Sequence, residues 1–152
     1  MLTEAEKAYA AGLFDGEGSI IIDKPRRGKG HALMVQLGMR EPAAVAWLQE
    51  RWPGSLRPYA HRLKEREVFT FWHWRRSTSS ASTFLGDILP YLLVKREQAQ
   101  LAIEFQSHKS FGRRLTDDVL ALDESYRARL RALRKELGRA AVIPPHATPL
   151  GG

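Results

Sequence analysis

A stripe of residues almost without side chains places the tightest constraint on what this chain can fold into. In the predicted first helix Ala8, Gly12 and Gly16 lie four residues apart, and Ala11 lies beside them. A glycine inside a helix costs about 1 kcal/mol relative to alanine, so Gly12 needs a packing reason. Small residues at this spacing allow another backbone to approach closely, which favours a close helix–helix crossing. The alternative is that the stripe packs against the sheet of its own domain.

Two acidic residues follow the stripe where the helix is predicted to pass into a strand. They are Asp15 and Glu17, with Gly16 between them. Carboxylates at a helix C-terminus oppose the helix dipole, which favours cations there. A bound Mg²⁺ would remove this misfit, because carboxylate and free carbonyl oxygens are hard ligands. The alternative is a solvated turn.

The remaining pattern predicts an α+β fold. Thr3 and Glu6 have the spacing of a capping box, so the first helix should run from near residue 4 to Asp15-Gly16. Strands are predicted at 19–23, 31–39, 56–63 and 67–74. Further helices are predicted at 41–51, from 77–82 through 89, at 95–106, and after Thr116 through 137, with Pro90 as an interruption. The last helix has an apolar stripe formed by Val119, Leu122, Tyr126, Leu130, Leu133 and Leu137. The order αββαββααα predicts a four-stranded antiparallel sheet backed by helices in one domain, 1–142, followed by a tail, 143–152.

Composition points to a polyanionic partner. The chain has 152 residues, of which 24 are basic and 17 acidic, for a net charge of +7. Because 17 of the basic residues are arginine, which binds phosphate and guanine bidentately, nucleic acid is the expected partner. No apolar run could span a membrane and the N-terminal segment lacks the pattern of a signal peptide, so we expect no membrane partner and an intracellular location.

Several enzyme classes are excluded by missing residues. Without cysteine there is no disulfide, thiolate zinc site or cysteine nucleophile. Without asparagine there is no H-N-H nuclease motif, and neither Asp-x-Lys nor Glu-x-Lys occurs. P-loop and zincin motifs are also absent.

Two segments resemble one family. The run Tyr9-Ala-Ala-Gly-Leu-Phe-Asp-Gly-Glu-Gly-Ser19 resembles the signature helix of the LAGLIDADG homing endonucleases, and the run from Ile88 to Ala99 resembles that family's Pro-Tyr-Leu, basic, Gln-Ala stretch. The resemblance covers residues 5 to 108. It implies the αββαββα fold, with a saddle-shaped sheet and C-terminal helices. One motif in a short chain implies the homodimeric type of nuclease, which cuts a long pseudo-palindromic site in double-stranded DNA and leaves 3′ overhangs. We expect an intron-encoded protein, with an intein origin left open.

The resemblance also implies roles for individual residues. Glu17 and the Gly16 carbonyl would bind Mg²⁺, with Mn²⁺ able to substitute, and Lys95 would lie near the scissile phosphate. Glutamate replaces the more common aspartate at the metal-binding position. The family usually places a polar residue where this chain has Met39, so either Arg40 completes the catalytic water network or the network is built elsewhere. The dimer interface would be formed by Ala8, Ala11, Gly12 and Asp15, with Asp15 capping and bridging the two signature helices instead of binding metal.

The resemblance further implies that one face of the sheet lies in the DNA major groove, and strand alternation then sorts the side chains. With Leu33, Val35 and Leu37 toward the helices, Met34 and Gln36 point to DNA. The strand at 67–74 is apolar on both faces, so the buried face of Trp72 and Trp74 stays undecided. The predicted DNA-contacting residues are Ile21, Asp23, Arg26, Arg27, Lys29, His31, Met34, Gln36, Arg57, His61, Arg62, Lys64, Arg66, Arg75 and Arg76.

Two alternatives stay open. An intron maturase, or another nucleic-acid-binding protein that does not cleave, would have the same basic charge and strands; Met39 favours this class, whereas Glu17 and Lys95 favour cleavage. A purely structural dimerisation module would leave the charge of +7 unexplained.

Overall fold

A computed structural model describes residues 1–24, 27, 30–63, 67–110 and 112–140. The predicted tail at 143–152 lies outside this part of the chain. The elements, in chain order, are α1 (Glu4–Glu17), β1 (Gly18–Asp23), β2 (Ala32–Met39), α2 (Pro42–Arg51), β3 (Ser55–Leu63), β4 (Glu67–Ser77), α3 (Thr78–Ile88), the short 3-10 helix η2 (Leu89–Tyr91), α4 (Arg96–Ser107) and α5 (Asp117–Ala140). The predicted α+β fold and its element order are confirmed. No helix in the described ranges combines the length and apolar character needed to cross a membrane.

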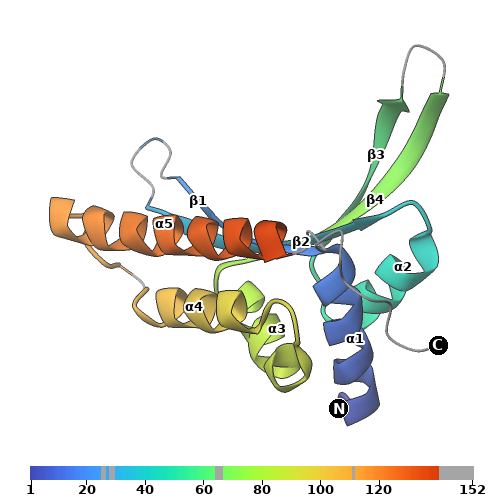
Figure 1. Cartoon of the computed structure of the whole chain (residues 1–152), viewed down its shortest axis with the longest axis horizontal. Coiled ribbons are helices and arrows are strands. Elements are labelled where there is room, and N and C mark those ends of the chain that lie inside the picture. The colour runs from blue at the N-terminus through green and yellow to red at the C-terminus, as the bar shows by residue number, and fades with distance from the viewer. Residues whose placement is uncertain (25–26, 28–29, 64–66, 111, 141–152) are drawn as a thin grey trace, which may run out of the picture.

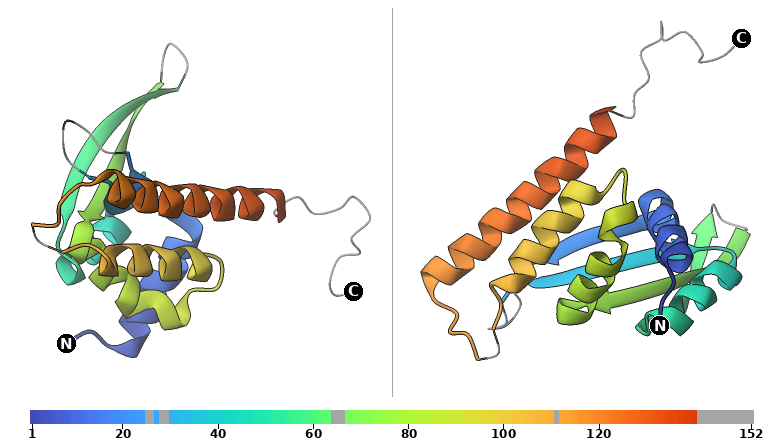
Figure 2. Two further views of the ribbon diagram at one scale, coloured as in Figure 1. Left: turned by 90° about the vertical axis from the view of Figure 1, so that its left-hand side faces the viewer. Right: turned by 90° about the horizontal axis from the view of Figure 1, so that it is seen from below.

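The sheet has four antiparallel strands in the order β1-β2-β4-β3 (Figure 1). The helices cover one face of it, as the view from below shows (Figure 2). Burial alternates along β1 and β2, and Leu33, Val35 and Leu37 lie in the core as predicted. No helix in the described part of the chain covers the opposite face of the sheet (Figure 2).

Helix α1 begins at the predicted capping box. The backbone N–H of Glu6 donates to Thr3 Oγ1 at 3.1 Å, and the backbone N–H of Thr3 donates to Glu6 Oε2 at 2.9 Å. The helix continues through Glu17, slightly beyond the predicted end, and passes directly into β1. This direct passage requires glycine at Gly18, because a Cβ there would lie 2.2 Å from the ring of Phe14.

The buried aromatic residues settle the orientation of β4. Trp74 is fully buried, and its Nε1 donates to the Trp52 carbonyl at 3.0 Å. Trp52 Nε1 donates in turn to Asp87 at 2.9 Å, and Phe84 packs edge-on against both indoles. Trp72 shares the face of Trp74 by alternation, so His73 and Arg75 face away from the helices.

The C-terminal helices form as the sequence predicts. Pro90 falls in the short helix η2 that separates α3 from α4, and the backbone N–H of Val119 donates to Thr116 Oγ1 at 3.2 Å, which caps α5. The predicted apolar stripe of α5 is partly different in the structure. Leu122 is 45% exposed, whereas Asp123 beside it is 1% exposed.

Candidate active site and nucleic-acid interface

The candidate active site lies where α1 meets β1. Glu17 is the last residue of the helix, and both it and Gly16 are exposed. The carbonyls of a helix C-terminus carry partial negative charge, and the last turn of α1 contains no basic residue. The exposed carboxylate of Glu17 and the last carbonyls of α1 thus form a region of negative potential on a chain with a net positive charge.

Asp15 is held inside its own chain. Its Oδ2 accepts from the backbone N–H of Leu93 at 2.9 Å, and its Oδ1 accepts from those of Val94 at 3.2 Å and Lys95 at 3.0 Å. These amides precede α4, so Asp15 caps the segment that enters that helix. The expected role of Asp15 as a bridge between two signature helices stays a prediction, because a carboxylate has about four acceptor positions and these three amides do not fill them.

Lys95 lies beside the end of α1. Its Nζ donates to the backbone carbonyl of Asp15. Burial is the largest influence on the pKa of Lys95 and lowers it below its ordinary value of 10.5; Arg134 lowers it further, whereas Asp15 and Glu17 act in the opposite direction. The structure thus brings the predicted Lys95 and Glu17 into one neighbourhood, although they are 78 positions apart in the sequence.

The donor atoms at this point suit a hard divalent cation in kind but are too few for a complete site. Within the described ranges no group of three or more His, Asp or Glu side chains surrounds one position. Glu17 provides one carboxylate, and the helix end provides carbonyl oxygens. Since divalent cations such as Mg²⁺ require about six oxygen ligands, one chain supplies only part of a set that water, substrate or a second chain would complete.

The small-residue stripe of α1 is free on its outer side. Ala8, Gly12 and Gly16 are exposed, and a Cβ added to either glycine would meet nothing within 4 Å. Ala11, by contrast, is fully buried in the core of its own chain. The prediction that Ala11 belongs to a dimer interface is therefore wrong, because its side of the helix faces the sheet.

The uncovered face of the sheet carries a first group of predicted contact residues. Ile21 pairs with Met34, and Gln36 pairs with Arg75, all on the face away from the helices. Arg75 Nη2 donates to Gln36 Oε1 at 3.3 Å. Asp23, Arg57 and His61 share this face by strand alternation.

Sequence reasoning missed four residues on the same face: Tyr59, Phe69, Phe71 and His73. The pairing of β3 with β4 sets them opposite Phe71, His61, Tyr59 and Arg57, respectively. Period-2 alternation could have found them, but the strand is apolar on both faces and the alternation therefore carried no signal.

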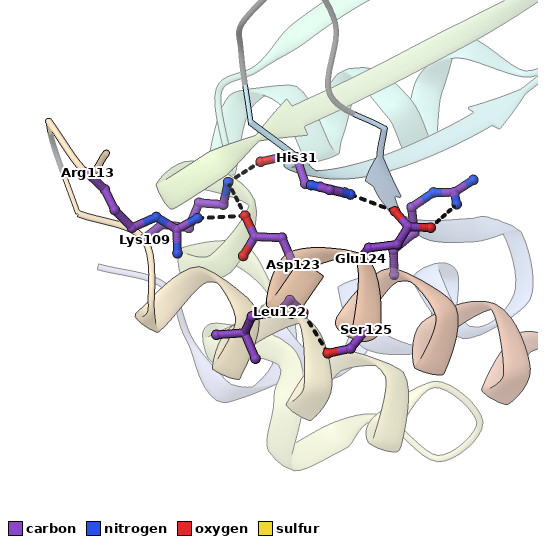
Figure 3. A network of polar contacts seen from close by, with 8 residues as sticks. His31, Lys109, Arg113, Leu122, Asp123, Glu124 and Ser125 are labelled. Atoms are coloured by element: carbon purple, nitrogen blue, oxygen red, sulfur yellow. Dashed lines mark hydrogen bonds and ion pairs between the residues drawn. The ribbon is translucent and has the colours of Figure 1, made fainter. Parts of the chain in front are cut away.

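His31 does not lie on the uncovered face of the sheet. It is 3% exposed, its Nε2 lies 2.7 Å from Glu124 Oε2, and its carbonyl accepts from Lys109 Nζ (Figure 3). The predicted contact of His31 with DNA is therefore wrong: β2 begins under α5, and Glu124 of that helix holds the ring.

Three predicted arginines have other surroundings than expected. Arg76 lies on the helix side of the sheet, where burial lowers its pKa and Asp87 opposes that effect, so its assignment to the DNA face is wrong. Arg62 is exposed but belongs by alternation to the same side as Trp74, which removes it from the face of Gln36. Arg40 lies over the ring of Phe69, with Cζ 4.1 Å from the ring centre.

The tips of both hairpins are described only in part. Arg27 is exposed, with a φ of 45° in the left-handed region. The other predicted tip residues, Arg26, Lys29, Lys64 and Arg66, lie outside the described ranges.

The architecture defines the fold of the LAGLIDADG homing endonucleases, as the resemblance predicted. Among solved structures, the homing endonuclease I-CvuI in complex with its target in the presence of Ca has a TM-score of 0.54 and 17% identity, over 95% of this chain and 87% of that chain. The archaeal intron-encoded homing endonuclease I-Vdi141I complexed with DNA has a TM-score of 0.58 and 15% identity, over 97% of this chain and 91% of that chain.

The fold also matches part of longer chains. The I-SmaMI LAGLIDADG homing endonuclease bound to cleaved DNA has a TM-score of 0.61 and 16% identity, and the match covers 98% of this chain but 52% of that one. No protein-family model and no curated protein sequence matches the chain. The likeness is thus one of fold.

Proposed function

We propose that the chain is a sequence-specific, divalent-metal-dependent endonuclease that acts on double-stranded DNA as a homodimer. The observation that carries this proposal is the exposed Glu17 at the end of α1 with Lys95 beside it. Solved structures of the same fold carry the names of homing endonucleases and include complexes with DNA. The net charge of +7 supports the same partner.

Glu17 and the carbonyl of Gly16 would hold Mg²⁺, with Mn²⁺ as a substitute. When bound, such a cation lowers the pKa of water and neutralises charge on a phosphate. The ammonium group of Lys95 would lie near the scissile phosphate. It does not form an ion pair with Glu17, because its Nζ donates to the carbonyl of Asp15. Asp15 in turn positions Lys95 by accepting its backbone N–H.

The incomplete ligand set and the exposed stripe on α1 support the homodimer. Two copies crossing at Ala8 and Gly12 would place two Glu17 carboxylates near each other at the C-terminal ends of their helices. The uncovered sheet faces would then lie along the major groove of a long pseudo-palindromic site, and cleavage across the minor groove between them would leave 3′ overhangs.

The dimer is tested by filling the stripe. Gly12→Leu adds a side chain that meets nothing in the monomer but blocks a close helix crossing, so it should dissociate the dimer without unfolding the chain. Analytical ultracentrifugation measures this directly. A wild type that sediments as a monomer at every concentration would overturn the homodimer.

Catalysis is tested on DNA sites first selected from a random duplex library by binding. Glu17→Gln keeps the size of the side chain and removes its charge, so binding should persist while single-turnover cleavage with Mg²⁺ is lost. Glu50→Gln is the matched control, because it makes the same change at an exposed residue of α2 that has no part in the proposed site. It should leave both binding and the cleavage rate within a few-fold of the wild type. Full cleavage by Glu17→Gln would disprove the assignment.

An intron maturase, or another nucleic-acid-binding protein without cleavage activity, is the second candidate. The contact between Arg40 and Phe69 favours it, because that contact holds the guanidinium on β4 while Met39 offers no polar replacement for the catalytic water network. A wild type that binds its selected site and does not nick it with Mg²⁺ or Mn²⁺ would support this candidate.

A further inference from the structure

We propose that the uncovered face of the β3–β4 hairpin reads the 5-methyl groups of thymine in the outer part of each DNA half-site. The surface consists of Tyr59, His61, Phe69, Phe71 and His73, which we call the aromatic patch. This inference rests on the proposed binding of double-stranded DNA and does not require cleavage.

The aromatic patch is a continuous layer of rings. The ring centres of Tyr59 and His73 are 4.8 Å apart, those of His61 and Phe71 are 5.5 Å apart, and those of Phe69 and Phe71 are 6.0 Å apart. The layer extends onto β2, because Phe71 lies against Gly38, where a Cβ would be only 2.9 Å from its ring. These contacts pack the rings edge to face along the strands and present an apolar surface.

The helices pack on the other face of the sheet, so the core does not explain why these positions are apolar (Figures 1 and 2). An apolar surface on the solvent side of a sheet marks an interaction site. The aromatic patch has cations at its borders: Arg57 and Arg75 line a hollow of about 210 Å³ next to Tyr59 and His73, and Arg40 lies over Phe69. This arrangement complements a DNA groove, with phosphates at its rims and base edges on its floor.

Thymine is the base that such a surface can select. Phe69 and Phe71 offer no hydrogen-bonding atoms, so they cannot pair with the N7, O6 or N4 atoms that distinguish other bases. Thymine alone exposes a methyl group in the major groove, and phenylalanine is a known contact for it. Burial, together with His61 and Arg75, lowers the pKa of His73, which favours the uncharged ring.

The inner part of the same face has different chemistry. Gln36 and Arg75 form a hydrogen-bonded polar pair across β2 and β4. Amide and guanidinium groups read the donors and acceptors of base edges. We therefore expect selected sites to combine inner positions of mixed composition with outer positions rich in A·T pairs.

Deoxyuridine provides the test, because it differs from thymidine in this position only by the methyl group. Sites are selected from the random duplex library, each outer thymine is replaced in turn by uracil, and dissociation constants are measured without Mg²⁺. Burial of one methyl corresponds to about a fourfold effect, so uracil should weaken wild-type binding by roughly three- to fivefold at one or more outer positions. Phe71→Ala should lose this thymine–uracil difference, and the matched control Gln36→Ala should keep it.

Each result has a definite meaning. If outer uracils leave wild-type affinity unchanged, or if Phe71→Ala keeps the full difference, the methyl-reading role is disproved while DNA binding stands. If no duplex is selected at all, the proposed function fails together with this inference. Tighter binding of single-stranded RNA than of any duplex, lost in Phe71→Ala, would make the aromatic patch a base-stacking surface and overturn the inference.

Discussion

The two hairpins of the sheet are supported in opposite ways. β1 and β2 carry buried residues on the helix side and contact α3, α4 and α5. β3 and β4 contact α2 near their base and then extend past the helices, where residues 57–62 are exposed (Figure 1). The first hairpin depends on the core behind it, whereas the second is covered by rings on its own solvent face. The comparison teaches that one sheet can take its apolar contacts from a helical core at one hairpin and from rings on its solvent face at the other.

Buried charges lie beside the first hairpin, formed by β1 and β2. Asp123 of α5 is 1% exposed and lies 2.6 Å from Arg113 and 3.3 Å from Lys109, while Lys109 also donates to the His31 carbonyl at the start of β2 (Figure 3). These ion pairs connect the first hairpin to α5 and to the segment before it. A buried ion pair does not always stabilise a protein, but loss of one member leaves the others without compensation.

The largest effect should come from breaking this network. Asp123→Ala leaves Lys109 and Arg113 unpaired and should lower the free energy of unfolding by about 3 kcal/mol, as measured by urea denaturation. The control is Leu122→Ala, one residue away and 45% exposed, which should cost less than about 1 kcal/mol. Equal losses from the two variants would show that the network does not support the first hairpin.

A smaller effect is expected from the second hairpin. Phe71→Ala removes ring contacts to His61, Phe69 and His73 without opening a core cavity, so we expect a loss of about 1 kcal/mol in the same denaturation experiment. The more sensitive measurement is hydrogen exchange along β3 and β4, which should accelerate with little change in β1 and β2. Equal acceleration in both hairpins would mean that they open as one unit.

The smallest effect concerns acid. The hydrogen bond with His31, followed by Arg127, holds the pKa of Glu124 below its ordinary value of 4.5. A carboxyl with a lowered pKa stabilises the folded state above about pH 4.5, and this contribution disappears as the pH falls through the folded-state pKa. The melting temperature of Glu124→Gln should therefore lie slightly below that of the wild type at neutral pH and converge with it toward pH 3. Because Glu124 is half-exposed, the difference in melting temperature should be small. A difference that grows as the pH falls would contradict the lowered pKa of Glu124.

Local signals in the sequence predicted most of the fold. The capping box of Thr3 and Glu6, the interruption at Pro90 and the alternation along β2 each depend on neighbours in the chain. The placements that failed depend on distant partners. Asp123 is buried instead of Leu122 because Lys109 and Arg113 reach it, and no helical periodicity contains that information.

The candidate site shows the same division. Glu17 could be singled out from its own segment, because an acid at a helix C-terminus opposes the dipole. The burial of His31 could not, since the basic turn before it suggests an exposed position and its partner Glu124 lies in another helix. The aromatic patch escaped detection because Phe69, Phe71 and Trp72 make both faces of β4 apolar, and only its pairing with β3 and β2 assigns the faces.

The junction of α1 and α4 has a consequence for how the protein opens. Asp15 accepts the amides that lead into α4, and the ammonium group of Lys95 covers the carbonyl of Asp15 in the last turn of α1. Each helix thus terminates on a group that belongs to the other, so unravelling either end exposes unsatisfied backbone in both. The two ends should melt in a single cooperative event, which would keep Glu17 from fraying although it is the last residue of an exposed helix end.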